Sequence, residues 1–106
     1  MNDYRPEVRS LLNALSRAGF APISVDNGEE MIRRSDVSKT EFLEEIVATD
    51  EATLRLQHNN KMVAVWLVLG SDPGEIAADY TDYEPLEVVI EEHYSRWESR
   101  KQPVIK

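Results

Sequence analysis

Two histidines, His58 and His93, are the only imidazoles in the chain that could act as bases or metal ligands. His93 falls on the apolar face of a predicted helix, where a buried neutral imidazole with one hydrogen-bond partner is the usual arrangement. His58 lies at the end of a predicted hairpin, where we expect solvent around it. A zinc site needs three or more ligands at a recognisable spacing, and this chain without cysteine shows none. We therefore expect no metal and no cofactor.

Pairs of carboxylates could serve as general acid and base. The candidate pairs are Asp26 with Glu29 or Glu30, Asp72 with Glu75, and Asp79 with Asp82. Each pair stands beside a predicted turn, where solvated carboxylates are usual. The sequence also lacks a glycine-rich phosphate cradle, a G-x-S-x-G nucleophile motif and a calcium loop. These observations favour a protein that is not an enzyme.

An alternative chemistry involves the two tryptophans. Trp66 lies in the most apolar run of the chain, and Trp97 shares the apolar helical face of His93. Two interpretations stay open. The rings form an aromatic part of the core between helix and sheet, or they line a pocket with His93 that binds a small molecule or serves a small enzyme. Solvent access to His93 distinguishes the two.

The charge of the chain is unevenly distributed. Twenty acidic residues against twelve lysines and arginines give a net charge of -8 at pH 7. Residues 1–40 hold six acids and six bases, so the whole excess falls in residues 41–106. Residues 72–92 contain eight acids and no lysine or arginine. Phosphate contacts need cations, so we expect no direct binding of nucleic acid there.

This acidic stretch either keeps the protein soluble or forms a face for a protein partner. Tyrosines stand among the carboxylates, a composition found in protein-binding patches as well as on plain surfaces. The candidate protein-binding residues are Asp72, Glu75, Asp79, Tyr80, Asp82, Tyr83, Glu84, Glu87 and Glu91. We expect a non-enzymatic interaction module with a basic protein as its partner. A sharper hypothesis is an inhibitor that occupies the nucleic-acid-binding site of that partner.

Three segments show the apolar period of helices, at residues 6–18, 39–48 and 84–99. Ser38 and Glu41 have the spacing of a capping box at the start of the second helix. In the third helix, Leu86, Val89, Ile90, His93 and Trp97 share one face.

Three segments are predicted to be strands, at residues 20–25, 53–57 and 62–69, whereas residues 29–33 and 75–81 each form either a further strand or a helical turn. Turns are expected at residues 26–28 and 58–61. We expect Ile23 and Val25 to share a face and Met31 to point inward. The unbroken apolar run at 62–69 predicts a strand covered on both faces at the centre of the sheet.

These elements predict an α+β fold, with a largely antiparallel sheet of four to five strands packed with three helices in the order α-β-β-α-β-β-(β)-α. Two layers, or a partial third layer, would satisfy this pattern. We expect one domain over residues 1–99 and a basic flexible tail over residues 100–106. If residues 29–33 or 75–81 form an exposed edge, two copies could pair there, so monomer and homodimer both stay open.

The longest apolar run has eight residues, which is too short to span a bilayer. The first ten residues lack the apolar core of a secretory signal. We therefore expect a cytoplasmic protein without a membrane partner.

Four short segments carry a resemblance to known sequences. They are DEAT at 50–53, VLGSDP at 68–73, ADYT at 78–81 and GFAPISVDNGEE at 19–30. Together they are similar to small acidic proteins of unknown function from proteobacterial phages, plasmids and genomic islands, over most of the chain. The resemblance implies a bacterial cytoplasmic setting and an accessory role on a mobile element. It carries no active-site residues.

Overall fold

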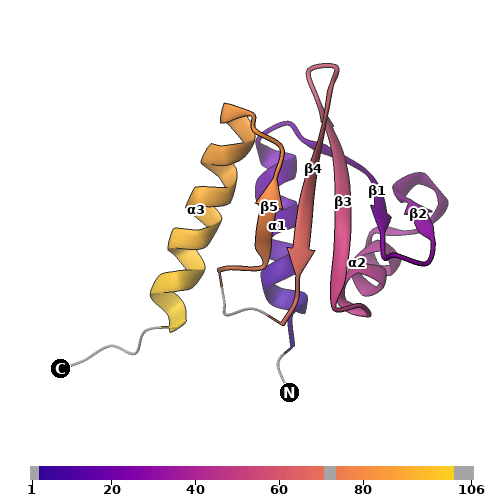
Figure 1. Ribbon diagram of the computed structural model, residues 1–106, viewed down its shortest axis with the longest axis horizontal. Coiled ribbons are helices and arrows are strands. Elements are labelled where there is room, and N and C mark those ends of the chain that lie inside the picture. Colours follow the sequence, from indigo (N-terminus) through magenta and orange to yellow (C-terminus); the bar gives the residue numbers. More distant parts are fainter. Residues whose placement is uncertain (1–2, 71–73, 102–106) are drawn as a thin grey trace.

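Helices form at the three places where the apolar period predicts them (Figure 1). The computed structural model describes residues 3–70 and 74–101. Within them α1 spans Arg5–Arg17, α2 spans Lys39–Val47 and α3 spans Glu84–Lys101. The last helix thus includes the first two residues of the predicted basic tail, and residues 102–106 lie outside the described part. No helix of the described residues is long and apolar enough to cross a membrane.

Five strands build one antiparallel sheet. They are β1 (Ala21–Asp26), β2 (Met31–Arg33), β3 (Glu51–His58), β4 (Lys61–Val68) and β5 (Ala77–Tyr80). The strand order is β2-β1-β3-β4-β5, with every neighbouring pair antiparallel. A short 3-10 helix, η1 (Arg34–Asp36), joins β2 to α2. The predicted α+β fold is confirmed, and the segment at 75–81 contains a strand.

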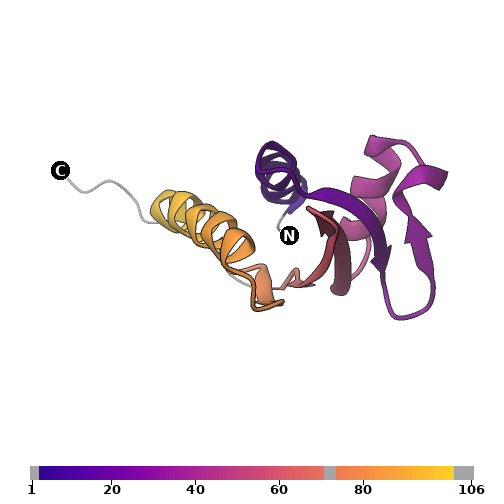
Figure 2. The ribbon, with the colours of Figure 1, turned by 90° about the horizontal axis from the view of Figure 1, so that it is seen from above.

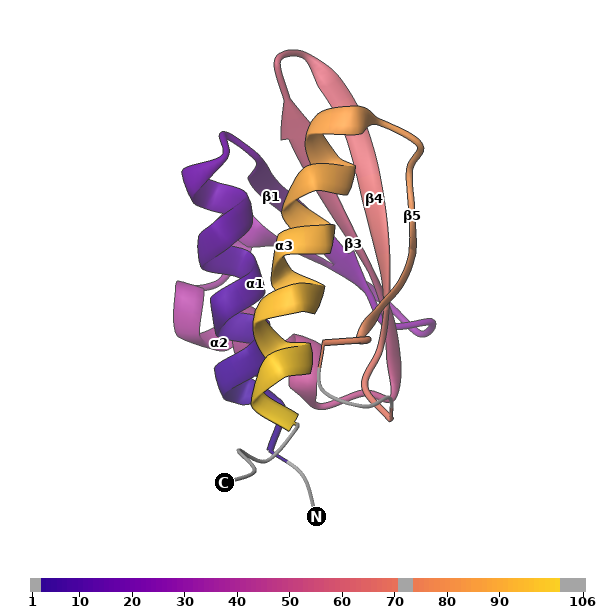
Figure 3. The same ribbon diagram turned by 90° about the vertical axis from the view of Figure 1, so that its left-hand side faces the viewer.

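The helices cover a single face of the sheet, so the domain has two layers (Figures 2 and 3). One continuous apolar core fills the space between them. Val8, Leu11 and Leu15 of α1 are completely buried in it, as are Leu54 and Leu56 of β3. No helix of the described residues lies against the opposite face of the sheet.

Two expectations for the apolar run at 62–69 are wrong. In β4, Val63, Val65 and Leu67 point into the core, while Met62 and Trp66 are 51% and 43% exposed on the bare face. The central strand is β3, since β4 lies next to the edge strand β5. The run is unbroken because apolar residues occupy both faces of β4, although only one of these faces is covered.

A β-bulge in β1 overturns a third expectation. The register with β3 shifts between Pro22 and Ser24, so that Ile23 is an extra residue. As a result Val25 is buried and Ile23 is 38% exposed, and the two do not share a face. Pro22 stands beside the bulge, and a proline within a strand is typical of an edge or a bulge, whereas the spacing of Ile23 and Val25 alone does not indicate one.

The turn between β1 and β2 forms where it is predicted. Gly28 has φ +93°, and its N–H donates a hydrogen bond of 2.8 Å to Oδ1 of Asp26. In the strand that follows, β2, the side chains point to the faces opposite to those we predicted. Met31 pairs with Asp26 and points away from the core, whereas Ile32 packs against the core.

The predicted hairpin of β3 and β4 is also confirmed. His58 and Lys61 are its last paired residues, so the turn has two residues. These are Asn59 and Asn60, with φ +49° and +68°. Asparagine tolerates this left-handed region better than most residues, and two such residues match the twist of a hairpin.

The predicted capping box at the start of α2 is present. Ser38 Oγ accepts a hydrogen bond from the N–H of Glu41 at 3.1 Å, and Glu41 Oε1 accepts one from the N–H of Ser38 at 3.0 Å. Two backbone donors that the helix cannot satisfy internally are thereby paired.

We expect Ser38→Ala to lower the free energy of unfolding by about 1 kcal/mol, because one capped N–H loses its acceptor. Ser35→Ala is the matched control, since Ser35 is exposed in η1, and it should change stability by less than about 0.5 kcal/mol. Urea denaturation followed by circular dichroism measures both variants. Equal stability of the two would contradict the role given to the cap.

Candidate interaction surface

Exposed carboxylates cover the region where β5 leads into α3. We call this region the acidic surface, and its described members are Glu75, Asp79, Asp82, Glu84, Glu87 and Glu91. All six are exposed. The two elements that carry most of them lie side by side (Figure 3). Asp72, also predicted for this surface, lies outside the described residues.

The spacing along α3 explains why its carboxylates face outward. Leu86, Val89 and Ile90 are buried against the core. Glu87 and Glu91 are one helical turn apart and fall on the other side of the helix, which is exposed. The same period that buries the apolar residues therefore gathers the acids on one strip.

Tyr80, at the end of β5, lies in the middle of these charges. Burial raises the pKa of its phenol, and the negative charges of Glu87, Glu91 and Asp79 raise the pKa further. Negative neighbours disfavour the phenolate, so the effect requires that carboxylates of both β5 and α3 act on one ring. Carboxylates of β5 and of α3 therefore lie within electrostatic reach of the same ring.

A groove of about 700 Å³ runs between β5 and α3. Tyr80 and Tyr94 supply aromatic surface to its lining, and Glu75 and Glu91 supply carboxylates. Sequence reasoning missed Tyr94, which is 42% exposed. Its position three residues after Glu91 was the available signal, because this spacing places the two side chains on the same side of a helix.

The free edge of the sheet at β5 is partly blocked by the strand itself. Asp79 Oδ1 accepts a hydrogen bond of 2.9 Å from the N–H of the next residue, Tyr80. A backbone donor that could pair with another strand is thus occupied, which is one way of protecting an edge strand. At the other edge, β2 has only three residues.

Tyr83, also predicted for the interaction surface, has a structural contact. Its hydroxyl lies 2.7 Å from Nδ1 of His58, and its ring meets Phe20 edge-on. His58 in turn stacks on Phe20, with ring centroids 4.3 Å apart. The expectation that solvent surrounds His58 is wrong, since this half-buried imidazole links the hairpin to the start of α3.

The alternative pocket of Trp66, His93 and Trp97 is not formed. Trp66 is on the bare face of the sheet, whereas His93 and Trp97 belong to α3 on the opposite face, with ring centroids 6.2 Å apart. The expectation of a buried His93 is confirmed, because the residue is 1% exposed. Trp66 is outside the core because it alternates along β4 with Val65 and Leu67, which point inward, and so faces the uncovered side of the sheet.

The hydrogen-bond partner of His93 is a buried carboxylate. Oε2 of Glu7 on α1 lies 2.8 Å from Nε2 of His93 and accepts a hydrogen bond of 2.9 Å from the N–H of Gly74. Nδ1 of His93 is buried and has no partner among the described residues. Sequence reasoning missed Glu7, because a carboxylate in the first turn of a helix is ordinarily a solvated one.

In the described part of the chain, no three histidine, aspartate or glutamate side chains gather closely enough to hold a metal ion. Comparison with protein-family models, curated proteins and solved structures returns no match. The resemblance to small acidic proteins of mobile elements therefore stays a prediction.

We expect Glu7→Ala to lower the free energy of unfolding by about 3 kcal/mol, because two buried nitrogens lose their partner at about 1–3 kcal/mol each. Glu7→Gln keeps a carbonyl oxygen at this place and should cost less. Glu29→Ala, at an exposed site in the β1–β2 turn, is the control. Urea denaturation measures all three, and a Glu7→Ala protein as stable as the control would contradict this account.

A second prediction concerns the effect of the neighbouring negative charges on the Tyr80 phenol. The double variant Glu87→Gln, Glu91→Gln should lower the pKa of the Tyr80 phenol toward its ordinary value of about 10, because two of the charges that disfavour the phenolate are removed. Titration by NMR of the tyrosine ring carbons measures this pKa. Glu29→Gln, Glu30→Gln is the matched control, and a similar shift in both double variants would show that the effect is not local.

Proposed function

We propose that the protein is a non-enzymatic interaction module that binds a basic segment of a partner protein on its acidic surface. The observation that carries the proposal is geometric: exposed carboxylates of β5 and α3 stand beside a groove between these elements, and Tyr80 and Tyr94 line that groove. A lysine or arginine placed beside the Tyr80 ring would meet several negative charges at once. Such complementarity steers association and selects the partner.

The groove between β5 and α3 supports the same proposal. Interfaces combine aromatic anchors with a polar rim, and tyrosine is among the residues enriched at their centres. Tyr80 and Tyr94 would be the anchors, and Glu75 and Glu91 would pair with cations of the bound segment. Val88, 48% exposed on the outer side of α3, adds apolar contact.

A sharper form of the proposal identifies the partner as a nucleic-acid-binding protein. Closely spaced carboxylates on one surface present a basic protein with charges in the manner of phosphates. In that case DNA or RNA would compete with this protein for the partner, and salt would weaken the complex steeply.

The test compares two variants with the same change in net charge. The acidic-surface variant is Asp82→Lys, Glu87→Lys, Glu91→Lys, which leaves Asp79 in place because its carboxylate caps the N–H of Tyr80. The control reverses Glu29, Glu30 and Asp36, which are exposed near the opposite edge of the sheet.

Each variant and the wild type are used, with a tag, to capture partners from bacterial lysate at low and high salt. The affinity for each captured protein is then measured with purified components. We expect the acidic-surface variant to bind roughly tenfold or more weakly and the control to bind almost normally. Equal binding by all three proteins, or the same loss in both variants, would refute the proposal. Competition by duplex DNA or RNA tests the sharper form.

A further inference from the structure

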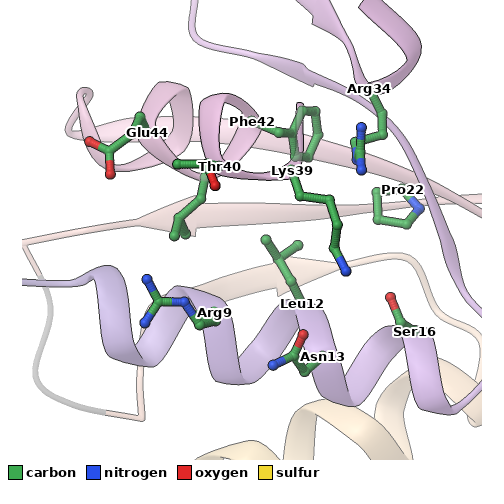
Figure 4. A pocket seen from close by; sticks show the side chains of 11 residues that line it. Arg9, Leu12, Asn13, Ser16, Pro22, Arg34, Lys39, Thr40, Phe42 and Glu44 are labelled. Carbon is green, nitrogen blue, oxygen red and sulfur yellow. The ribbon is translucent and has the colours of Figure 1, made fainter. Parts of the chain in front are cut away.

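A groove between α1 and α2 carries the opposite charge from the acidic surface (Figure 4). We call it the basic groove, and its lining consists of Arg9, Leu12, Asn13, Ser16, Pro22, Arg34, Lys39, Thr40, Phe42, Leu43 and Glu44. Its volume is about 410 Å³, which is within the range of sites for small molecules. In a chain of net charge -8, three cations in one groove need an explanation.

One wall of the groove is a second face of α1. Arg9, Leu12, Asn13 and Ser16 follow each other at the spacing of one helical face, beside the face that supplies the core. This wall offers a cation at one end, an apolar side chain in the middle, and amide and hydroxyl groups that can donate hydrogen bonds. Packing against the core accounts for Leu12 but not for Asn13 and Ser16, which are exposed.

The facing wall supplies two further cations. Lys39, the first residue of α2, extends across the groove toward Asn13 and Ser16 of α1 (Figure 4). Arg34 lines the groove together with Phe42, and its Nη1 donates a hydrogen bond of 2.9 Å to the carbonyl oxygen of Val37. That bond fixes the side chain and leaves other N–H groups of the guanidinium for a ligand.

The only carboxylate in the lining is already neutralised. Glu44 forms a two-pronged pair with Arg5, at 2.6 Å from Nη2 and 2.7 Å from Nε, and these bonds lower the pKa of Glu44. Arg9 also acts electrostatically on Glu44 and on Asp3, so its charge is partly balanced.

Arg34 and Lys39 are not balanced in this way. Neither forms an ion pair with any residue that the structure describes. Lys39 and Thr40 are the first two residues of α2, and the positive end of this helix is already offset by the carboxylate of Glu41 in its capping box, so the two side-chain cations are the main charges here. The groove therefore holds, in Arg34 and Lys39, two cations without an ion-pair partner among the described residues.

We infer that the basic groove binds a small organic anion, with its carboxylate or phosphate oxygens between Arg34 and Lys39 and its apolar body against Leu12 and Pro22. Charge complementarity selects the anion, and hydrogen bonds from a guanidinium to an oxyanion are among the strongest that a side chain makes. The apolar residues of the lining favour a ligand with a hydrocarbon or aromatic part over a free inorganic ion. This site is separate from the acidic surface and does not depend on its proposed function.

The probes are 4-phenylbutyrate, phenyl phosphate and the uncharged 4-phenylbutanamide, each titrated into the ¹⁵N-labelled protein and followed by NMR. We expect saturable shifts of the Leu12, Ser16 and Thr40 amide resonances with at least one of the two anions, and none with the amide. Inorganic phosphate alone should bind more weakly than the better organic anion. The ratio of the dissociation constants of 4-phenylbutyrate and phenyl phosphate shows whether the groove prefers a carboxylate or a phosphate ester.

Two variants locate the site. Lys39→Gln should raise the dissociation constant of the better anion roughly tenfold, because one charged partner is lost. Arg55→Gln removes an exposed cation of β3 outside the groove and should leave the dissociation constant unchanged. The inference is overturned if neither anion saturates these shifts, if the amide binds as well, or if both variants weaken binding equally. Shifts of the same resonances with an acidic peptide but with neither anion would also overturn it.

Discussion

A single carboxylate oxygen joins three separate parts of the fold. Oε2 of Glu7 contacts His93 of α3 and Gly74, which lies just before β5 in the chain. All three groups are buried. A buried polar group is costly unless it is paired, so the position of α3 beside α1 and the path of the chain into β5 are set together. The acidic surface and the groove beside it lie on β5 and α3, so the geometry of both depends on the contacts of Glu7.

The two halves of the chain contribute surfaces of opposite character. The first forty residues, with balanced charges, supply most of the basic groove, and the fold brings Arg34 and Lys39 together there while Glu44 is turned toward Arg5. The second half supplies the carboxylates of β5 and α3. A sum of charges over the sequence hides this arrangement, because a net charge of -8 describes neither surface. Separation of charge in space is what gives each surface a chemistry of its own.

Local sequence patterns were sufficient for the order of the elements and for the type of most of them, while the segments at 29–33 and 75–81 were left open between a strand and a helical turn. The capping box at Ser38, the turn at Gly28 and the asparagine pair of the hairpin each act within a few residues, so each could be predicted. The acidic residues of α3 were also predictable as a group, because helical spacing alone places Glu87 and Glu91 on one side.

Features that depend on contacts between distant segments could not be predicted in the same way. The bulge at Ile23 is a matter of register between two strands, and the outward position of Trp66 depends on which face of the sheet the helices cover. Glu7 and Gly74 are 67 residues apart, and only the folded chain brings them together. The basic groove likewise joins one face of α1 to the start of α2, and neither segment alone indicates a site.

The two tryptophans lie in different surroundings, because only one face of the sheet is covered by helices. Trp66 is open to solvent on the uncovered layer, while Trp97 is half-buried near Ser10, with its Nε1 donating a hydrogen bond of 3.4 Å to the hydroxyl oxygen. A solute that quenches fluorescence by collision therefore reaches one indole more easily than the other. The molecule carries its own pair of optical probes, one for each layer, and events at the sheet can be separated from events at the helices without any label.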